Sequence, residues 1–464
     1  MKDALGRCAK WVRRFLSAPE RFYATISLVF GVVLALIVPL GANSDEAAHY
    51  YRIQQLARFN LLTTGDEVEN GIWLDEGEAL VLNQENFAKT LHEEDAVAYN
   101  VTHYYERTGQ DVQTTGGMTS AVYSPIGYLP QIFGAWGGKI LGLPLNLEAL
   151  GMRFLGLLAQ TILVFFAIKI IPKGKWFLAI FALLPAMVVQ STTISADAMT
   201  NSVCVLYISL LFAFVISAGW DKLLLWGLVF CILILGLVKP PYFLLVGLAP
   251  TLFFINKSLR NRRTIWVIMG ATVASVGCAV AWNYLVRNVP IWTPDGVMPD
   301  KQIAYILSSP LAPIEAFFNS IFVGLSDFRR HLTLTGMFMW DSTPLSPYFM
   351  VISTVAVTMA IYLKDRREVG DRVWDKVRRW RWWLVGVGMG MVVAISAVLY
   401  LKYTVVGANN IIGVQGRYFL PLLPLVIMPF LKGRHEIRKL GVVVACILCL
   451  VATVATIVSR ITFA

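Results

Sequence analysis

The sequence predicts an all-α protein that crosses a membrane many times. Of its 464 residues, 57% are hydrophobic and only 15% are charged, a balance too apolar for a soluble chain of this length. Runs of about 18 or more nearly uncharged residues recur along the chain, and one helix needs about that length to cross a bilayer. A membrane β-barrel would instead show short strands of alternating polarity.

Eleven apolar runs are predicted to be transmembrane helices. They are expected at residues 22–42, 149–170, 175–194, 197–218, 222–239, 241–256, 264–285, 345–363, 384–402, 415–431 and 440–459. The first run is too long for a signal-peptide core and lacks a small-residue cleavage site, so we expect it to be retained. The six cysteines lie mostly inside apolar runs, which is typical of small buried side chains rather than of a disulfide framework.

The distribution of charge predicts the orientation of these helices. The net charge is +11, yet residues 43–123 hold 14 acidic residues and only four Lys or Arg. The remaining Lys and Arg gather in short loops, which face the cytoplasm by the positive-inside rule. We therefore expect a cytoplasmic N-terminus, an extracytoplasmic C-terminus and an acidic first loop on the outer side. The basic clusters indicate topology, and no nucleic-acid partner is expected.

This topology divides the chain into six parts. They are a cytoplasmic N-terminus (1–21), a first transmembrane helix (22–42), a first extracytoplasmic loop (43–148), transmembrane helices two to seven (149–285), a second large extracytoplasmic loop (286–344) and the C-terminal transmembrane helices (345–464). Within the first loop, the acidic stretch of about 62–118 shows no clear periodicity.

One apolar run, from Tyr123 to Leu143, does not fit this alternation. If it spanned, every later basic cluster would face outward, and it is interrupted by Pro125, Pro130 and several glycines. We expect it to lie in the outer interface. The stretch after Asp45 shows a similar helical spacing, so the first loop is predicted to hold two interfacial helices. The segment 313–328 of the second loop has the same pattern.

Polar residues gather at the outer ends of the predicted helices, where ionisable groups are costly and usually face a cavity or a partner. They are Asp45, Glu46, His49, Arg52, Tyr123, Tyr128, Arg153, Asp197, Asn201, Lys239, Tyr242, Asn283, Arg287, Gln415, Arg417 and Tyr418. The inner ends show only simple basic runs. The placement of acids and cations at one level predicts a functional site there.

Each of these residues also has a plain structural explanation. Asp45 could cap a helix, and Glu46 could offset its dipole. Lys239 and Arg417 could extend to lipid headgroups. The spacing of Asp45, Glu46 and His49 also leaves open a divalent metal such as Mg²⁺ or Mn²⁺, although a metal site needs more ligands. No other cofactor is expected.

The combination of groups suits one kind of chemistry. A carboxylate at the boundary between water and lipid can take a proton from an acceptor hydroxyl. Arg and Lys at the same depth can bind a phosphate, Arg through its fork and Lys as a point charge. A sugar carried on a polyprenyl phosphate would place its phosphate at this depth, so the set predicts glycosyl transfer from such a donor.

The motifs themselves resemble a known family. An acidic motif after the first helix and interfacial helices in a long first outer loop are similar to the GT-C superfamily of membrane glycosyltransferases. Within it, NSDEAAHYYRIQQLA, YSPIGYLPQIFG, SADAMTN, KPPYFLL and VQGRYFLPLLP resemble a bacterial family long catalogued as a domain of unknown function (DUF2142-like). The motifs run from Asn43 to Pro424, nearly the whole chain, and are specific only as a set.

The resemblance implies roles for several residues. Asp45 matches the catalytic base of an inverting transferase, with Glu46 as its companion and as a second metal ligand where a metal is used. Lys239 and Arg417 match positions near the donor phosphate, and Arg153 is a weaker candidate. Tyr123 and Tyr128 would border the groove. The implied setting is a bacterial cytoplasmic membrane, with the active site on the extracytoplasmic side and a cell-envelope glycan or lipid-linked glycan as acceptor.

Two alternatives remain at this point. A polyprenyl-linked glycan ligase or polymerase would favour a lone histidine in a late outer loop, for which His331 is the candidate. A transporter would place its charges near the bilayer midplane and often show internal repeats. The sequence shows no evident repeat, and its acidic motif comes early.

Overall fold

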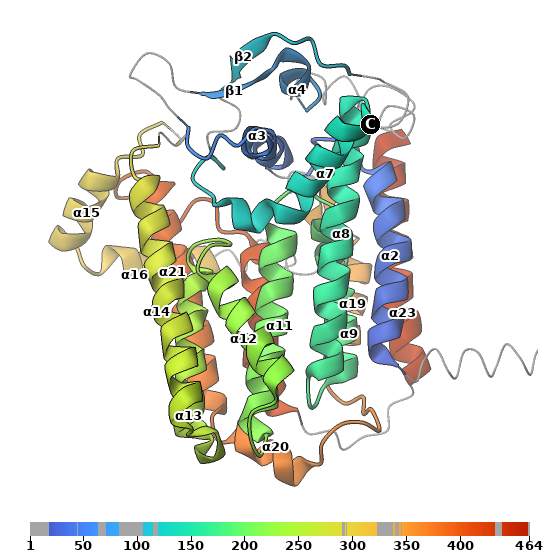
Figure 1. Ribbon diagram of the computed structural model, residues 1–464, viewed down its shortest axis with the longest axis vertical. Helices are drawn as coiled ribbons and strands as arrows, with labels where there is room; N and C mark the ends of the chain where they lie inside the picture. The colour runs from blue at the N-terminus through green and yellow to red at the C-terminus, as the bar shows by residue number, and fades with distance from the viewer. Residues whose placement is uncertain are drawn as a thin grey trace, which may run out of the picture.

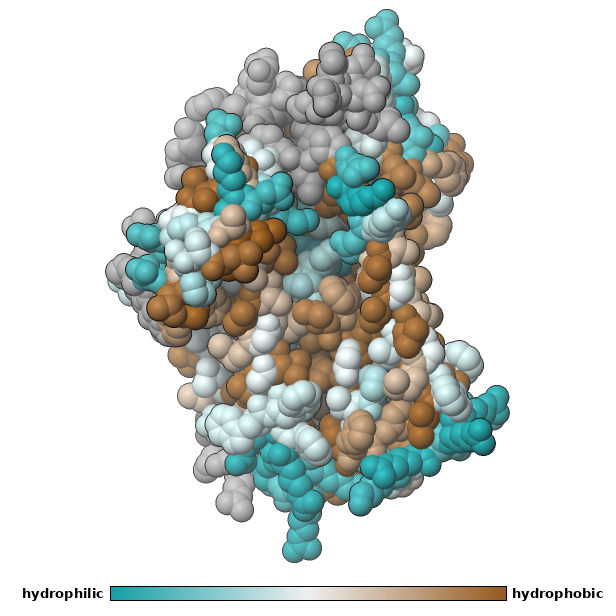
Figure 2. Space-filling model, turned by 90° about the vertical axis from the view of Figure 1, so that its left-hand side faces the viewer, coloured by the Kyte–Doolittle hydropathy of each residue, from teal (hydrophilic) through white to brown (hydrophobic). Residues whose placement is uncertain are grey.

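The computed structural model describes residues 18–43, 45–63, 71–82, 105–114, 119–289, 293, 295–322, 337–338, 343–344, 346–431 and 439–462. These residues form an upright bundle of helices with smaller elements across one end (Figure 1). On the face shown in Figure 2, a broad apolar surface lies above a hydrophilic lower end. This arrangement is that of an all-α membrane protein.

Within the described part of the chain, six helices are long and apolar enough to cross a membrane. They are α2 (Pro19–Ile37), α8 (Leu145–Ile170), α11 (Asp197–Ile216), α14 (Arg262–Leu285), α21 (Arg381–Lys402) and α23 (Lys439–Thr462). Each coincides with one of the eleven predicted transmembrane helices, with ends that differ by a few residues. The prediction of a multi-pass helical membrane protein is therefore confirmed.

The other five predicted transmembrane segments coincide with helices that are shorter or broken. They are α9 (Lys175–Ala182) with α10 (Pro185–Ser191), α12 (Lys222–Leu235), η2 (Tyr242–Gly247) with α13 (Leu248–Ile255), α19 (Pro347–Ala360), and η5 (Gly416–Leu422) with α22 (Leu423–Ile427) and η6 (Met428–Phe430). Proline explains several breaks, because it removes a backbone donor and clashes with the preceding turn. Pro185 and Pro424 each stand in the first turn of the helix that restarts. The count of eleven stays a prediction.

Helix α11 is the centre of the bundle. Of its most apolar 18-residue window, 89% is buried, against 28% for α14. Helix α11 packs against α8, α12, α13 and η5, and it is apolar on all sides, as a helix surrounded by other helices must be. Its first residue, Asp197, therefore stands at the middle of one end of the bundle.

Two short helices lie across that end. They are α3 (Glu46–Ala57) and α7 (Leu129–Leu141), which follows a turn of 3-10 helix, η1 (Pro125–Tyr128). With 13 residues, α7 is about 20 Å long, too short to cross a hydrocarbon layer of about 30 Å. It packs closely on α8 through Gly134 and Gly138. These lengths suit the expected interfacial positions.

The segment predicted to be the second extracytoplasmic loop contains two helices among its described residues. Helix α16 (Ala312–Phe322) covers the first part of the segment predicted at 313–328, and the remainder of that segment lies outside the described residues. Helix α15 (Pro299–Ser308) was not predicted. Both contact α21 and stand to one side of the bundle (Figure 1).

The acidic insert contains regular structure that the sequence did not reveal. Strand β1 (Ile72–Asp75) pairs antiparallel with β2 (Asp111–Thr114), and α4 (Glu76–Leu80) follows β1. Asp75 begins α4 with a capping box, in which its side chain accepts a hydrogen bond from the Gly77 amide. Strands of four residues are too short to show clear alternation, which explains why the pattern was missed.

The remaining described elements are a short strand pair, a helix at the end of the bundle opposite α3, and a short connecting helix. Strand β3 (Met337–Phe338) pairs with β4 (Thr343–Pro344). At the end of the bundle opposite α3, α20 (Asp371–Arg378) lies near the lower end of α11, as Figure 1 shows. The short η3 (Lys257–Leu259) joins α13 to α14. The basic residues of α20 and η3 therefore lie toward the end of the bundle opposite the acidic insert.

Candidate functional site

Four charged side chains meet where α3, α11, the segment after α12 and η5 come together. Asp45 Oδ2 lies 2.5 Å from Arg417 Nη2, and Asp197 Oδ1 lies 2.7 Å from Lys239 Nζ. Arg417 Nη1 joins the two pairs at 3.9 Å from Asp197 Oδ2. We call these residues the four-charge cluster. Its two acids and two cations balance, and they come from segments up to 372 positions apart in the sequence.

The backbone at Asp45 presents its carboxylate outward. Asp45 precedes α3 in the left-handed conformation, with φ 63° and ψ 4°, and its side chain makes no capping hydrogen bond. The helix-cap explanation for Asp45 is therefore wrong. Most non-glycine residues are strained in this conformation by roughly 1–2 kcal/mol, and aspartate tolerates it better than most. Such strain is typical of functional sites.

The partners of Asp45 are held at helix ends. Asp197 is the first residue of α11, and Lys239 stands between the end of α12 and η2. Arg417 follows Gly416 at the start of η5. The side chain of Lys239 is only 10% exposed and contacts Asp197, so it does not extend to the lipid headgroups. The snorkelling explanation is therefore wrong for Lys239.

Tyrosine rings surround the two cations. Lys239 Nζ lies 5.7 Å from the ring centre of Tyr123 and 5.0 Å from that of Tyr418, and the Arg417 guanidinium lies 5.5 Å from the Tyr418 ring. Such contacts stabilise a cation by about 0.5–2 kcal/mol. The Tyr242 hydroxyl donates to the Tyr418 carbonyl at 2.5 Å, which fixes η5 against η2.

His49 lies one turn after Asp45 and is buried. Its Nδ1 is 2.6 Å from the Tyr128 hydroxyl oxygen, and its ring stacks on Tyr123 with the centroids 5.7 Å apart. Burial, together with the nearby Lys239 ammonium, lowers the pKa of His49 to about 4. The imidazole is therefore neutral at physiological pH, and the cluster keeps its charge balance.

The pKa of Asp45 depends on Arg417. Burial would raise this pKa, but the attraction of the Arg417 guanidinium outweighs burial and holds the pKa of Asp45 below its usual value. The Lys239 ammonium acts in the same direction. While it is paired with Arg417, Asp45 is consequently a weak base.

Arg52 and Asn201, two of the predicted site residues, support their neighbours. The buried Arg52 guanidinium donates to the Tyr123 carbonyl from Nη2 at 2.9 Å and from Nε at 3.2 Å. It therefore positions the loop that carries Tyr123. Asn201 donates from Nδ2 to Gln190 Oε1 at 2.6 Å inside the bundle.

Glu46 and Arg153 pair with each other and not with the four-charge cluster. Both side chains are fully buried. Arg153 donates from Nε to Glu46 Oε1 at 2.8 Å and from Nη2 to Glu46 Oε2 at 2.7 Å. The amides of Gly41 and Ile194 also donate to Glu46, at 3.1 and 3.0 Å. This geometry favours a structural role, in which Glu46 fixes α3 to α8, over the predicted roles in catalysis and phosphate binding.

The same geometry bears on the predicted metal site. The Asp45 and Glu46 carboxylates have different partners, Arg417 and Arg153, and do not converge on a common point. Across the described part of the chain, no group of three or more His, Cys, Asp or Glu side chains is arranged to hold a metal ion. The adjacent carboxylates therefore do not fit a divalent metal.

Gln415 and Arg287, the other predicted residues, lie in different surroundings. Gln415 directly precedes η5, and its Oε1 is buried without a hydrogen-bond partner, as is Asn43 Nδ2 beside Asp45. Such atoms are rare and call for an explanation. Arg287 is exposed, follows the end of α14, and lies 3.7 Å over the ring of Tyr284 in the last turn of that helix. The structure does not bring it into the cluster, and His331 lies outside the described residues.

The sequence reasoning missed two neighbours of the cluster. Asn43 is buried two positions before Asp45. Tyr403 follows α21, and burial raises its pKa; Tyr418 and Asp45 raise it further, while Lys239 opposes them. A tyrosine at the outer end of a predicted transmembrane helix was the available signal.

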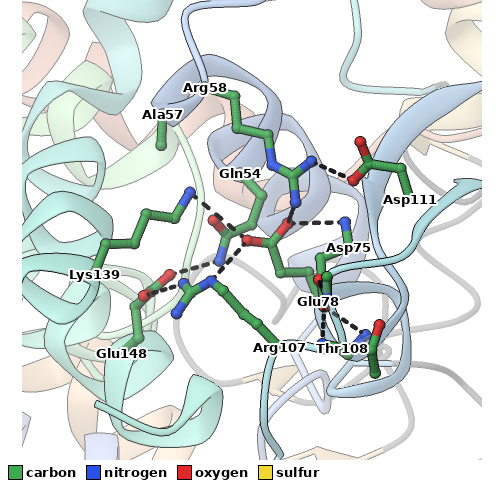
Figure 3. A network of polar contacts seen from close by, with 12 residues as sticks. Gln54, Ala57, Arg58, Asp75, Glu78, Arg107, Thr108, Asp111, Lys139 and Glu148 are labelled. Atoms are coloured by element: carbon green, nitrogen blue, oxygen red, sulfur yellow. Dashed lines mark hydrogen bonds and ion pairs between the residues drawn. The ribbon is translucent and has the colours of Figure 1, made fainter. Parts of the chain in front are cut away.

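A second polar network fastens the acidic insert to the bundle (Figure 3). Glu78 of α4 is fully buried and pairs with Arg58 at 2.7 Å, while Arg107 and Lys139 lie 3.4 and 3.6 Å away. Glu148 of α8 accepts from Arg107 at 2.5 Å and from Gln54 at 2.7 Å. Helix α3 is thus held near both ends, which gives Asp45 a rigid support.

The fold and the cluster define a multi-pass membrane protein with a charged site at one end of its helices. The chain belongs to the family described as predicted membrane protein (DUF2142), whose model matches residues 28–426. The resemblance to this family is confirmed. No curated protein and no solved structure matches the chain.

Proposed function

We propose that this protein is a GT-C-type membrane glycosyltransferase with eleven transmembrane helices. It transfers a sugar from a polyprenyl-phosphate donor to a cell-envelope glycan or lipid-linked acceptor. The observation that carries the proposal is the four-charge cluster, in which a part-exposed carboxylate and two cations stand at the end of the bundle that α3 and α7 cross. A base and a phosphate-binding pair at this depth suit a substrate whose tail lies in the bilayer.

The reaction is a single displacement. Asp45 accepts the proton of the acceptor hydroxyl as its oxygen attacks the anomeric carbon. The bond between that carbon and the phosphate oxygen breaks, and its electron pair leaves with the polyprenyl phosphate. The anomeric configuration inverts, because the acceptor attacks from the face opposite the leaving group. Atoms and charge balance without a cofactor.

The cations act on the leaving phosphate. Arg417 can bind two of its oxygens through the guanidinium fork, and Lys239 adds a second positive charge. Their closeness to the Tyr123 and Tyr418 rings fixes both cations before substrate arrives, so little rearrangement is needed as charge develops. The two orphaned polar atoms, Gln415 Oε1 and Asn43 Nδ2, are candidates for hydrogen bonds to the sugar.

The setting follows from the charge distribution. The basic loops face the cytoplasm of a bacterial cell, and the cluster, on the side of the acidic insert, faces outward. The donor diffuses within the cytoplasmic membrane and reaches the cluster from the lipid. The insert beside it would meet the acceptor.

A donor panel tests the proposal. The purified protein in lipid nanodiscs should transfer label from a polyprenyl-phosphate sugar and not from a nucleotide sugar. Arg417→Lys should lower kcat/KM for the donor by about 10–150-fold, since a charged hydrogen bond contributes roughly 1.5–3 kcal/mol and lysine cannot replace the fork. Arg287→Lys, which changes an exposed arginine that the structure does not bring into the cluster, is the matched control and should have little effect. Transfer from nucleotide sugars alone would overturn the proposal.

A further inference from the structure

We infer that the donor phosphate displaces Asp45 from Arg417, so that Asp45 becomes available as a base only in the donor complex. This inference rests on the proposed function. It assigns to the Asp45–Arg417 pair a second role, in which the catalytic carboxylate occupies the place of the phosphate until the donor arrives.

The two ion pairs of the cluster differ in how open they are. In the Asp197–Lys239 pair, the two side chains are 9% and 10% exposed. In the other pair, Arg417 is 15% exposed, whereas Asp45 is 44% exposed. The Asp45 carboxylate therefore lies on the open side of the guanidinium, where an incoming anion would arrive. A carboxylate and a phosphate oxygen offer arginine the same kind of acceptor, so they compete for it.

Arg417 keeps a counterion when Asp45 leaves. Its Nη1 lies 3.9 Å from Asp197, which Lys239 holds in place from the other side. The guanidinium is thus fixed by a buried neighbour while its open side exchanges partners. Asp45 does not need a new buried partner, because its carboxylate already reaches water and does not cap α3.

Charge balance couples this exchange to the proton transfer. Arg417, Lys239 and the neutral groups His49, Tyr128 and Tyr403 surround Asp45, and Asp197 pairs with the two cations, so the total charge with Asp45 is zero. A phosphodiester adds one negative charge beside the displaced carboxylate. Like charges raise the proton affinity of a carboxylate. Donor binding therefore favours the movement of the acceptor proton to Asp45, and the donor should bind before the acceptor reacts.

This exchange predicts an effect that is not expected if the catalytic base does not compete with the phosphate for Arg417. Removing the Asp45 carboxylate should tighten the binding of the donor phosphate, because a competitor for Arg417 has gone. The affinity of polyprenyl monophosphate should be measured for protein in nanodiscs of neutral lipid. Asp45→Asn should bind it about 10-fold more tightly than the natural protein, the lower end for one charged hydrogen bond. Inorganic phosphate, added as a competitor, shows whether the lipid tail is required.

Two further variants complete the experiment. Asp111→Asn removes a carboxylate of the insert that pairs with Arg58. It removes as much negative charge as Asp45→Asn does, and it should leave the affinity for polyprenyl phosphate unchanged. Asp45→Gly suits the positive φ and also removes the carboxylate, and it should match Asp45→Asn. Equal or weaker binding by both Asp45 variants would overturn the inference and leave the transferase proposal standing. If the natural protein does not bind polyprenyl phosphate, both fail.

Discussion

Replacing Glu46 with glutamine separates a structural role from a catalytic one. Four donors converge on this buried carboxylate, two from Arg153 and one each from the Gly41 and Ile194 amides, at 2.7–3.1 Å. The amide nitrogen of glutamine cannot accept a hydrogen bond, so it would be placed against N–H groups that are themselves donors. Arg153 would also lose its counterion. Breaking one side of a buried ion pair costs about 3–5 kcal/mol, so Glu46→Gln should shift the folding equilibrium by more than about 100-fold.

The assay is thermal unfolding of the purified protein in detergent, followed by donor turnover of the folded fraction. We expect Glu46→Gln to unfold at a temperature well below that of the natural protein. Its activity per folded molecule should change little. Asp111→Asn is the control, because its pair with Arg58 is largely exposed and worth about 0–1 kcal/mol. A Glu46→Gln protein that keeps its stability but loses activity by 100-fold or more would refute this reasoning and restore Glu46 to the chemistry.

Two further predictions concern stability. The pKa of His49, about 4 when folded, lies below its usual 6.5, so the unfolded chain binds the proton first. The contribution of His49 to the free energy of unfolding should be fully present above about pH 6.5 and fall by about 3 kcal/mol as the pH drops to about 4. His49→Gln should flatten this pH dependence in unfolding experiments, and an unchanged slope would contradict the prediction. Gly138→Ala should destabilise the protein by about 1–3 kcal/mol, because the added Cβ would lie 2.5 Å from Glu148 Cγ. Gly137→Ala is the control, because a Cβ added at Gly137 would meet open space. Equal melting temperatures for the two variants would count against the close packing at Gly138.

Much of the fold could be predicted from the sequence because long apolar runs report their own secondary structure. All six long helices fall on predicted segments, and Asp197 and Lys239 lie at helix ends as expected. The breaks within shorter segments depend on tertiary packing as well as on proline. The four-residue strands β1 and β2 depend on pairing between residues about 40 positions apart, which no local pattern reveals.

The site could be predicted only in part, for a similar reason. The sequence placed Asp45, Asp197, Lys239 and Arg417 at one level, but not their pairing, which joins distant segments. It also treated the neighbours Asp45 and Glu46 as a unit. Asp45 stands before α3 in the left-handed conformation, whereas Glu46 is the first residue of the helix, so their side chains diverge and one meets Arg417 and the other Arg153. A buried arginine beside a buried acid can be recognised only when both positions are known.

The rate of sugar transfer by Asp45→Asn tests the central claim most directly. The substitution is nearly isosteric and removes the proposed base. With a radiolabelled polyprenyl-phosphate sugar and protein of verified fold, transfer should fall by about 10²–10⁴-fold, the usual contribution of a general base. Asp111→Asn should transfer at the natural rate. Full activity in Asp45→Asn would contradict the account.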